Sequence, residues 1–298
     1  MIKQGTWYAV AAYVLWGVFP IYWKQLHNIP PLEVIGYRII WSFVTVSLIL
    51  MWGKNWGKFI KAITKPGVLV TYGIASLLIG INWLIYISAI NSNYIIETSL
   101  GYFINPLLSV LLGVIVLKER LRIWQWIPVT LAASGMIYMT LTYGKVPWIA
   151  LSLALSFGLY GLVKKKASLI SLYGLMVETS FLLIPSIVYL IILQFSGKTV
   201  LLQTGVQTNL LVFLSGIVTI IPLLLFASAA QKISLTLIGI LQYLAPTLQF
   251  IIGVFIYREA ITNNQLIGFV LVWMALIFFV LEGFVNSRRQ PLLLINKE

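Results

Sequence analysis

The sequence repeats itself at an offset of about 140 residues, and this repeat limits the fold to a duplicated architecture. Residues 105–120 and 245–260 carry proline, glycine, a basic residue and glutamate at matching positions. The matched pairs are Pro106 and Pro246, Gly113 and Gly253, Lys118 and Arg258, and Glu119 and Glu259. Further pairs are Trp7 and Trp148, Gly17 and Gly158, Ser88 and Ser228, and Gln125 and Gln265. Two copies of one unit therefore fill almost the whole chain.

Each copy contains five apolar stretches close to the roughly 20 residues that a helix needs to cross a bilayer. Apolar residues make up 60% of the chain, against roughly 45–50% in soluble proteins, and charged residues only 9%, against about 25%. The stretches are continuous, whereas the strands of a membrane β-barrel alternate between apolar and polar residues. We therefore predict an all-α integral membrane protein with ten transmembrane helices. The predicted spans are 4–23, 34–52, 68–90, 96–117, 123–142, 146–163, 172–194, 208–230, 236–257 and 263–284.

Five crossings in each copy are an odd number, so the second copy is inverted relative to the first. The first five-helix repeat covers residues 1–143 and the second covers residues 144–285. Residues 286–298 form a predicted cytoplasmic tail. Inverted repeats of this kind are typical of secondary transporters.

The net charge of +13 is distributed unevenly between the predicted loops. With the N-terminus inside, only Lys24, Lys145, Lys198 and Arg258 lie outside, and Arg38 lies within a span. The fifteen predicted cytoplasmic cations are Lys3, Lys54, Lys58, Lys61, Lys65, Lys118, Arg120, Arg122, Lys164, Lys165, Lys166, Lys232, Arg288, Arg289 and Lys297. This positive-inside bias places both termini in the cytoplasm. Attraction to anionic inner-leaflet lipid explains the excess charge, so we expect membrane lipid and no nucleic acid as a partner.

The inventory of reactive side chains argues against an enzyme. The chain has one histidine, His27, seven glutamates, and neither aspartate nor cysteine. A catalytic trio with histidine as its base cannot be assembled, and no cluster has metal-ligand spacing. We therefore predict no catalytic residue, no metal site and no cofactor.

Several motifs occur in the same order as in a known transporter group. They are WGVFPIYWK at 16–24, EVIGYRIIWS at 33–42, INWLIYISAIN at 81–91, ETSLGYFINPLLSVLLG at 97–113, IPLLLFASAA at 221–230 and GILQYLAPTLQF at 239–250. On these motifs the chain resembles the RarD group of the EamA families, in the drug/metabolite transporter superfamily. The resemblance implies two inverted five-helix repeats around a central cavity, alternating access and export of small metabolites. Members of the group are often called chloramphenicol permeases.

Two prolines interrupt predicted spans at equivalent positions of the two copies. Pro106 and Pro246 each remove a backbone hydrogen bond and free the carbonyl one turn earlier. We expect both to act as hinges, with a purely structural kink as the alternative. Gly113 and Gly253 lie two turns further on and are expected to permit close helix contact.

Two charged residues within the spans are candidates for gating or coupling. Arg38 and Glu178 are 140 residues apart and therefore occupy equivalent positions of the two copies. A charge within a span is costly and usually faces a cavity or a partner. Glu97 and Glu33 are the expected partners of Arg38, and the alternative is an arginine that reaches the interface. If export is coupled to protons, Glu178 and Glu97 are the expected carboxylates, because burial favours their protonated form.

Aromatic and amide residues concentrate in the spans that carry the motifs. Together they would form a wall that is apolar but offers hydrogen bonds, which suits a flat or amphipathic solute. Interfacial aromatic belts are the alternative for such residues. The predicted cavity residues are Trp16, Tyr37, Asn82, Trp83, Tyr86, Tyr102, Asn105, Tyr160, Phe226, Gln242 and Tyr243.

The sequence thus predicts a multi-pass secondary transporter of the bacterial inner membrane that exports a small organic solute. A metabolite such as an amino acid and an amphipathic drug are both compatible with it. A lipid or lipid-carrier flippase would use the same fold and remains the alternative. The substrate, the coupling ion and the oligomeric state stay open, and a monomer is compatible with the sequence.

Overall fold

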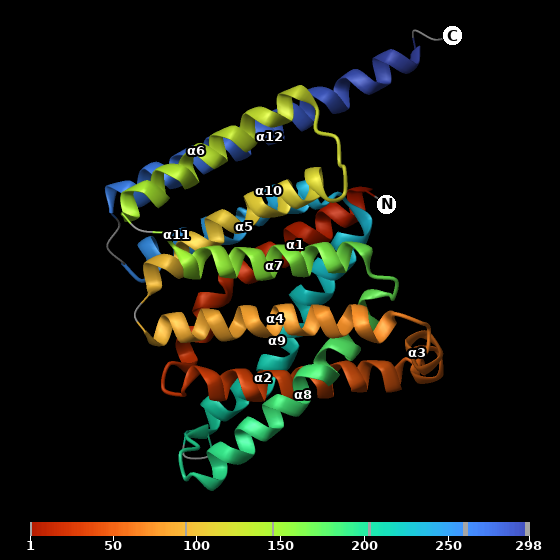
Figure 1. The fold of residues 1–298 in the computed structure, drawn as a ribbon, viewed down its shortest axis with the longest axis vertical. Coiled ribbons are helices and arrows are strands. Elements are labelled where there is room, and N and C mark those ends of the chain that lie inside the picture. Colours follow the sequence, from red (N-terminus) through yellow and green to blue (C-terminus); the bar gives the residue numbers. More distant parts are fainter. Residues whose placement is uncertain (1, 93, 145, 202–203, 259–261, 296–298) are drawn as a thin grey trace.

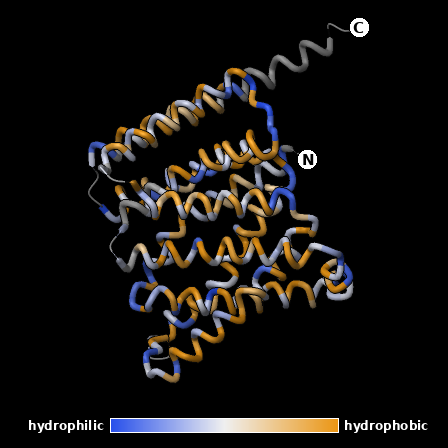
Figure 2. The backbone as a smooth tube through the Cα atoms, in the orientation of Figure 1, coloured by the Kyte–Doolittle hydropathy of each residue, from blue (hydrophilic) through white to orange (hydrophobic). Residues whose placement is uncertain are grey.

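The computed structural model describes residues 2–92, 94–144, 146–201, 204–258 and 262–295. The described residues form helices and their connections, with no β-strand among them. Figure 2 shows hydrophobic residues along the helices and hydrophilic residues concentrated in the connections at their ends. This distribution matches the all-α membrane protein that the composition predicts.

The helices of the first half end near residue 143. They are α1 (Ile2–Trp23), α2 (Pro31–Trp52), α3 (Trp56–Ile63), α4 (Val68–Asn91), α5 (Ile95–Ile115) and α6 (Trp126–Tyr143). The helices of the second half are α7 (Trp148–Lys166), α8 (Ser171–Phe195), α9 (Val206–Lys232), α10 (Leu235–Gln242), α11 (Leu244–Ile251) and α12 (Asn263–Ile295). A π-helical turn at Ile252–Ile256 continues α11. The short helix α3 lies between the predicted spans 34–52 and 68–90.

Six helical segments among the described residues are long and apolar enough to cross a membrane. They are Pro31–Trp52, Val68–Ala89, Trp148–Lys166, Ser171–Phe195, Val206–Lys232 and Leu235–Ile256. Shorter apolar helices lie at Gly101–Ile115 and Leu266–Phe279. Each of the ten predicted spans overlaps a helical segment of the structure.

The helices form one bundle with a helix pair along its edge (Figure 1). α5 packs against α7 and α10, and α1 packs against α9 and α11. α2 packs against α8 and α9, while α4 packs against α7 and α8. α6 and α12 pair with each other at one edge of the molecule (Figure 1).

The helix contacts come in matched pairs across the two halves. By the sequence offset, α1, α2 and α4 correspond to α7, α8 and α9, and α5 corresponds to α10 with α11. The contact of α1 with α9 therefore corresponds to that of α7 with α4. The contact of α2 with α9 likewise corresponds to that of α8 with α4.

Single residues repeat this correspondence. A Cβ atom built on Gly17 would lie 2.7 Å from Leu248 Cβ, and one built on Gly158 would lie 3.1 Å from Leu108 Cδ2. Both glycines therefore allow close approach of a helix that carries the equivalent leucine. Lys118 and Arg258, another equivalent pair, adopt left-handed φ angles of 56° and 54°.

The two equivalent prolines differ in their surroundings. α5 passes through Pro106 as one helix, whereas α10 ends at Gln242 and α11 begins at Leu244, just before Pro246. The carbonyl oxygen of Pro106 lies against Gly239, where a built Cβ atom would be only 2.6 Å away. A helix break thus accompanies the proline of the second half, while the proline of the first half marks a helix crossing.

Candidate substrate-binding cavity

A cavity of about 310 Å³ lies between the two halves of the chain. α1, α2, α4 and α5 line it from the first half, and α7, α9, α10 and α11 line it from the second. Its size lies at the lower end of the roughly 300–1,000 Å³ of small-molecule sites. A small organic molecule, enclosed by both halves, fits this volume.

Aromatic side chains form much of the cavity wall. Trp16 of α1 meets Phe157 of α7 edge-on, with ring centroids 6.0 Å apart. Tyr86 of α4 and Tyr102 of α5 meet in a similar way, also at 6.0 Å. The wall can therefore contact the faces of a flat or apolar solute.

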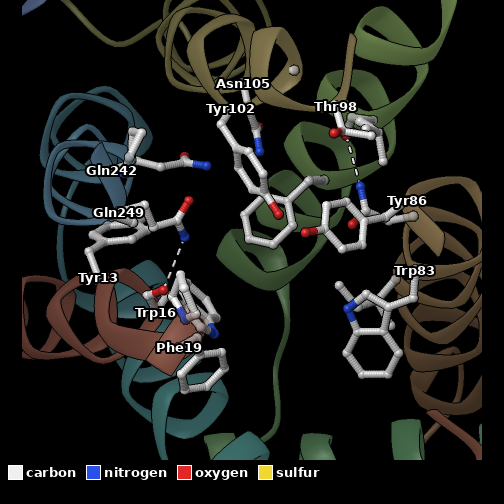
Figure 3. A pocket seen from close by; sticks show the side chains of 18 of the residues that line it. Tyr13, Trp16, Phe19, Trp83, Tyr86, Thr98, Tyr102, Asn105, Gln242 and Gln249 are labelled. Carbon is white, nitrogen blue, oxygen red and sulfur yellow. Dashed lines mark hydrogen bonds between the residues drawn. The ribbon is translucent and has the colours of Figure 1, made fainter. Parts of the chain in front are cut away.

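Two amide side chains of the wall connect the halves. Asn82 of α4 donates hydrogen bonds to the carbonyl of Leu153 and to the hydroxyl of Ser156, both at 2.9 Å. Gln249 of α11 donates to the carbonyl of Trp16 at 3.1 Å (Figure 3). These bonds fix the two amides, so each has less freedom to bind a solute.

A different set of polar atoms in the wall lacks partners. Six buried side-chain atoms have no hydrogen-bond partner in the described part of the chain. They are Tyr13 Oη, Arg38 Nε, Arg38 Nη2, Asn105 Oδ1, Thr219 Oγ1 and Gln242 Oε1, and all of their residues line the cavity. Buried polar groups are normally paired, because an unpaired one costs about 1–3 kcal/mol. A bound molecule with polar groups would satisfy them.

A second hollow of about 260 Å³ adjoins the cavity between the ends of α1, α2 and α4. Trp23, Arg38, Trp83 and Tyr86 line both spaces and form the neck between them. The second hollow reaches His27 in the loop before α2, which the charge distribution places outside. The Arg38 guanidinium lies 4.0 Å from the centroid of the Trp83 ring and 5.3 Å from that of Trp23. Cation–π contact thus holds the arginine at the neck.

The opposite end of the cavity is closed by packed aromatic rings. Phe226 of α9 stacks on Tyr160 of α7, with centroids 5.9 Å apart and an interplanar angle of 13°. Tyr13, Trp16 and Phe157 pack around Phe226 at 5.5–6.3 Å. Tyr160 and Phe226 are buried behind the wall in the largest core cluster.

A buried ion pair lies beyond this aromatic cluster. Glu178 of α8 accepts a hydrogen bond from Lys164 at 2.5 Å and one from the hydroxyl of Tyr160 at 3.0 Å. The side chains of Lys164 and Glu178 are almost inaccessible, with residue exposures of 1% and 2%. The sequence counts Lys164 among the loop cations, whereas the structure buries it. No local signal could reveal this, because its partner lies on another helix.

The structure brings seven of the predicted cavity residues together in one wall. They are Trp16, Asn82, Trp83, Tyr86, Tyr102, Asn105 and Gln242, with Arg38 and Pro246 beside them. Figure 3 shows Tyr13, Gln242 and Gln249 on one side of the cavity and Trp83 and Tyr86 on the other. Substrate contact by these residues stays a prediction.

The structure places four predicted cavity residues elsewhere. Tyr37 packs against the cluster around Leu26, Ile29 and Val34 and does not line the cavity. Tyr243 is buried, and its hydroxyl donates to the carbonyl of Phe103 at 3.2 Å. Tyr160 and Phe226 belong to the closing cluster instead of the wall.

The partner residues expected for Arg38 also differ from the structure. Glu33 accepts backbone hydrogen bonds from Val200 and Leu201 at 3.1–3.2 Å, so it fixes the loop before α9 instead of pairing with Arg38. Glu97 lies in α5, but its side chain is outside the described residues. Pro106 does not line the cavity.

Sequence reasoning missed several wall residues, among them Tyr13, Phe19, Thr219 and Gln249. Helical spacing could have found two of them. Tyr13 precedes Trp16 by three residues, and Gln249 follows Gln242 by seven, so each shares a helix face with a predicted wall residue. Thr219 gives no comparable signal.

Comparison with known proteins identifies this architecture. The family model described as "EamA-like transporter family" matches twice, over residues 3–141 and 145–281. The chain belongs to the EamA-like transporter family. This EamA-family chain is 42% identical to "Uncharacterized transporter YojE" of Bacillus subtilis, over 93% of each chain. It is 38% identical to "Protein RarD" of Escherichia coli, over 96% of this chain and 97% of that one.

A solved structure shares the fold. One crystal structure matches with a TM-score of 0.71 at 18% identity, covering 93% of this chain and 97% of the other. Together, the relatives and the apolar helices make this EamA-family chain a multi-pass membrane permease of the RarD type. The description of the family and the name of the Bacillus subtilis relative, both of which say transporter, agree with the prediction that it is not an enzyme.

Proposed function

We propose that this permease exports a small organic metabolite or an amphipathic drug across the bacterial inner membrane by alternating access. The observation that carries the proposal is the cavity between the halves, where six buried polar atoms have no hydrogen-bond partner among the residues that the structure describes. An ordinary packing interface would pair or exclude such atoms. A wall of aromatic rings with unpaired polar atoms suits the transient binding of an amphipathic solute.

The ten-helix, inverted-repeat architecture is part of this proposal. The two successive family matches and the matched helix contacts support two repeats, residues 1–143 and 144–285. Five spans in each repeat would invert the second relative to the first. The excess of cations in the predicted inner loops supports cytoplasmic termini.

The two ends of the cavity support an outward-open arrangement. One end adjoins the second hollow at Arg38, while aromatic rings and the Lys164–Glu178 pair close the other. In the opposite state, the Tyr160–Phe226 stack would separate and the neck at Trp23 and Arg38 would close.

Transport by purified protein in proteoliposomes tests the proposal. The solute mixture contains amino acids and amphipathic drugs, with and without an imposed pH gradient. Chloramphenicol is included because a relative in Pseudomonas aeruginosa, 26% identical, is named "Chloramphenicol-sensitive protein RarD". Movement of at least one solute above empty liposomes is expected. No movement of any solute would count against a small-molecule transporter.

Proton coupling is tested with the same vesicles. If Glu178 or Glu97 carries protons, Glu178→Gln or Glu97→Gln abolishes the stimulation by the gradient. Glu282→Gln is the matched control, because Glu282 pairs with Arg122 and does not line the cavity. Equal transport with and without a gradient would contradict proton coupling and would indicate facilitated exchange.

Alternating access is tested with single cysteines, since the natural chain contains none. Phe19→Cys places a thiol in the cavity wall, and Tyr160→Cys places one at the equivalent position of the second half, within the closing cluster. In the outward-open state the thiol at position 19 should react with a membrane-impermeant reagent from outside, while that at 160 is protected. A transported substrate should shift both reactivities in opposite directions. Labelling unaffected by substrate would contradict alternating access.

A lipid or lipid-carrier flippase is the second candidate. It is favoured by the second hollow, where Val34 and Ile35 of α2 and Ile87 of α4 offer apolar walls at the end of the bundle. Scrambling of fluorescent lipid in the same proteoliposomes, without movement of soluble solutes, would favour this function.

A further inference from the structure

The neck of the cavity contains a cation with an unused binding edge. Arg38 Nε and Nη2 have no hydrogen-bond partner among the described residues, although both atoms are buried. These two nitrogens lie along the same edge of the guanidinium. A side-on carboxylate binds that edge with one oxygen on each nitrogen, and such two-point pairing is stronger than a single hydrogen bond.

The surroundings of Arg38 favour an anion at this edge. Trp23 and Trp83 contact the guanidinium through their rings and use no N–H donor of the arginine. None of the described residues that line the wall is an aspartate or a glutamate. A buried charge within a membrane span is costly unless it is paired, so the cation is best satisfied when an anion enters the cavity.

Two of the other unpaired atoms belong to residues on the far side of the cavity. Tyr13 and Gln242 lie across the cavity from Trp83, the ring on which Arg38 rests (Figure 3). Their unpaired atoms, Tyr13 Oη and Gln242 Oε1, can exchange hydrogen bonds with a hydroxyl or amino group but carry no charge. Trp16, Tyr86 and Tyr102 provide apolar surface for the part of a ligand between the two polar ends.

We propose that the substrates are organic carboxylates with a flat apolar body, whose carboxylate binds the Nε–Nη2 edge of Arg38. A neutral polar group at the other end of the substrate meets Tyr13 and Gln242. The proposal rests on the transporter function proposed above and names its substrate class. Neutral solutes use only the aromatic wall, and cations are repelled at the neck.

Binding to the purified full-length protein in detergent tests the charge preference directly. The probes share one skeleton: 3-(4-hydroxyphenyl)propionate, its neutral primary amide, and the amine that replaces the carboxylate by an ammonium. Isothermal titration calorimetry should give an affinity for the acid about tenfold or more above that of the amide, because charge-assisted bonds exceed neutral ones by this order. Equal or tighter binding of the amide or amine, or no binding of the acid, would overturn the proposal.

Substitutions of Arg38 test whether this residue causes the preference for the acid over the amide. In Arg38→Gln the acid and the amide should bind alike. Arg38→Lys keeps the charge but loses the two-nitrogen edge, so it should still prefer the acid with lower affinity. Arg122→Gln removes a cation that pairs with Glu282 outside the cavity and should leave the preference unchanged. A preference that survives in Arg38→Gln would assign it to another residue and contradict the proposal.

Glu97 provides a further check, because its side chain is outside the described residues. If its carboxylate occupied the Arg38 edge, the acid would bind weakly to the unaltered protein and more tightly to Glu97→Gln. That result would overturn the proposal, whereas unchanged acid binding in Glu97→Gln supports it.

Transport measurements with the same probes distinguish a failure of the carboxylate proposal from a failure of the transporter function. Acid-selective binding without movement in proteoliposomes would keep the binding site and contradict transport of this solute. Transport of the amide or of chloramphenicol in preference to the acid would keep the transporter function and overturn the carboxylate class.

Discussion

Arg38 and Glu178 occupy equivalent positions of the two halves but have opposite surroundings. Glu178 is buried among its partners, with Lys164 at 2.5 Å and the Tyr160 hydroxyl at 3.0 Å. Arg38 faces a cavity, with two of its nitrogens unpaired among the described residues. Their partners also correspond between the halves: Trp23, which contacts Arg38, matches Lys164, which pairs with Glu178, at an offset of 141 residues.

This difference shows that equivalent positions of the two halves hold their charged residues in different ways. At the closed end, a charge and its partners hold two helices of the second half together, α7 and α8. At the open end, aromatic rings hold the charge without neutralising it, so it stays available to a ligand. A charge that stabilises the fold and a charge that binds a ligand should respond differently to substitution, as measured by unfolding in detergent.

Breaking the Lys164–Glu178 ion pair should have the largest effect on the free energy of unfolding. Lys164→Met leaves Glu178 buried without its cation, which should reduce the free energy of unfolding by about 3–5 kcal/mol. The double variant Lys164→Met with Glu178→Met is the control. It should recover most of the loss, because apolar residues often replace a buried pair at little cost. A small effect of the single variant would mean that the pair is open to water.

Substitutions at the helix crossings should have the second-largest effect on the free energy of unfolding. Gly17→Ala places a methyl group against the Cβ atom of Leu248, which cannot move without the backbone, so a loss of about 1–3 kcal/mol is expected. Gly158→Ala meets the more mobile end of Leu108 and should cost less. Thermal unfolding of both variants measures the difference. Equal losses would contradict the tighter packing of α1 on α11.

Removal of one hydrogen bond at the closed end of the cavity should have an intermediate effect on the free energy of unfolding. Tyr160→Phe removes the hydroxyl that donates to Glu178 and should cost about 1.5 kcal/mol, as for bonds to charged groups. Tyr243→Phe removes a bond to a neutral carbonyl, that of Phe103, and should cost less. Chemical unfolding of the two variants under the same conditions tests this order.

Replacement of Arg38 should have the smallest effect on stability. Arg38→Met removes a buried cation without leaving a described anion unpaired, so the free energy of unfolding should change by less than about 1 kcal/mol or rise. Carboxylate binding should be lost at the same time. A loss of stability as large as that of Lys164→Met would show that Arg38 pairs within the fold, and would remove the contrast between the two positions.

The sequence predicted much of the helical framework but only part of the site. Apolar length located helical segments, and the repeat identified equivalent residues, since both are properties of local sequence. Asn82, Asn105 and Gln242 were predicted in the wall because they belong to the aromatic and amide residues of the spans that carry the motifs. Tyr160 and Phe226 met the same compositional criterion, yet they pack behind the wall.

The sequence by itself determined that the chain is membrane-embedded and duplicated, because hydropathy and the 140-residue offset need no knowledge of packing. Only the tertiary structure decided what each charge does. Glu178 meets Lys164 from another helix, Glu33 meets the loop before α9, and Arg38 meets a cavity. These partners lie far away in the sequence or on other helices, and the way the helices pack determines which side chains can reach one another.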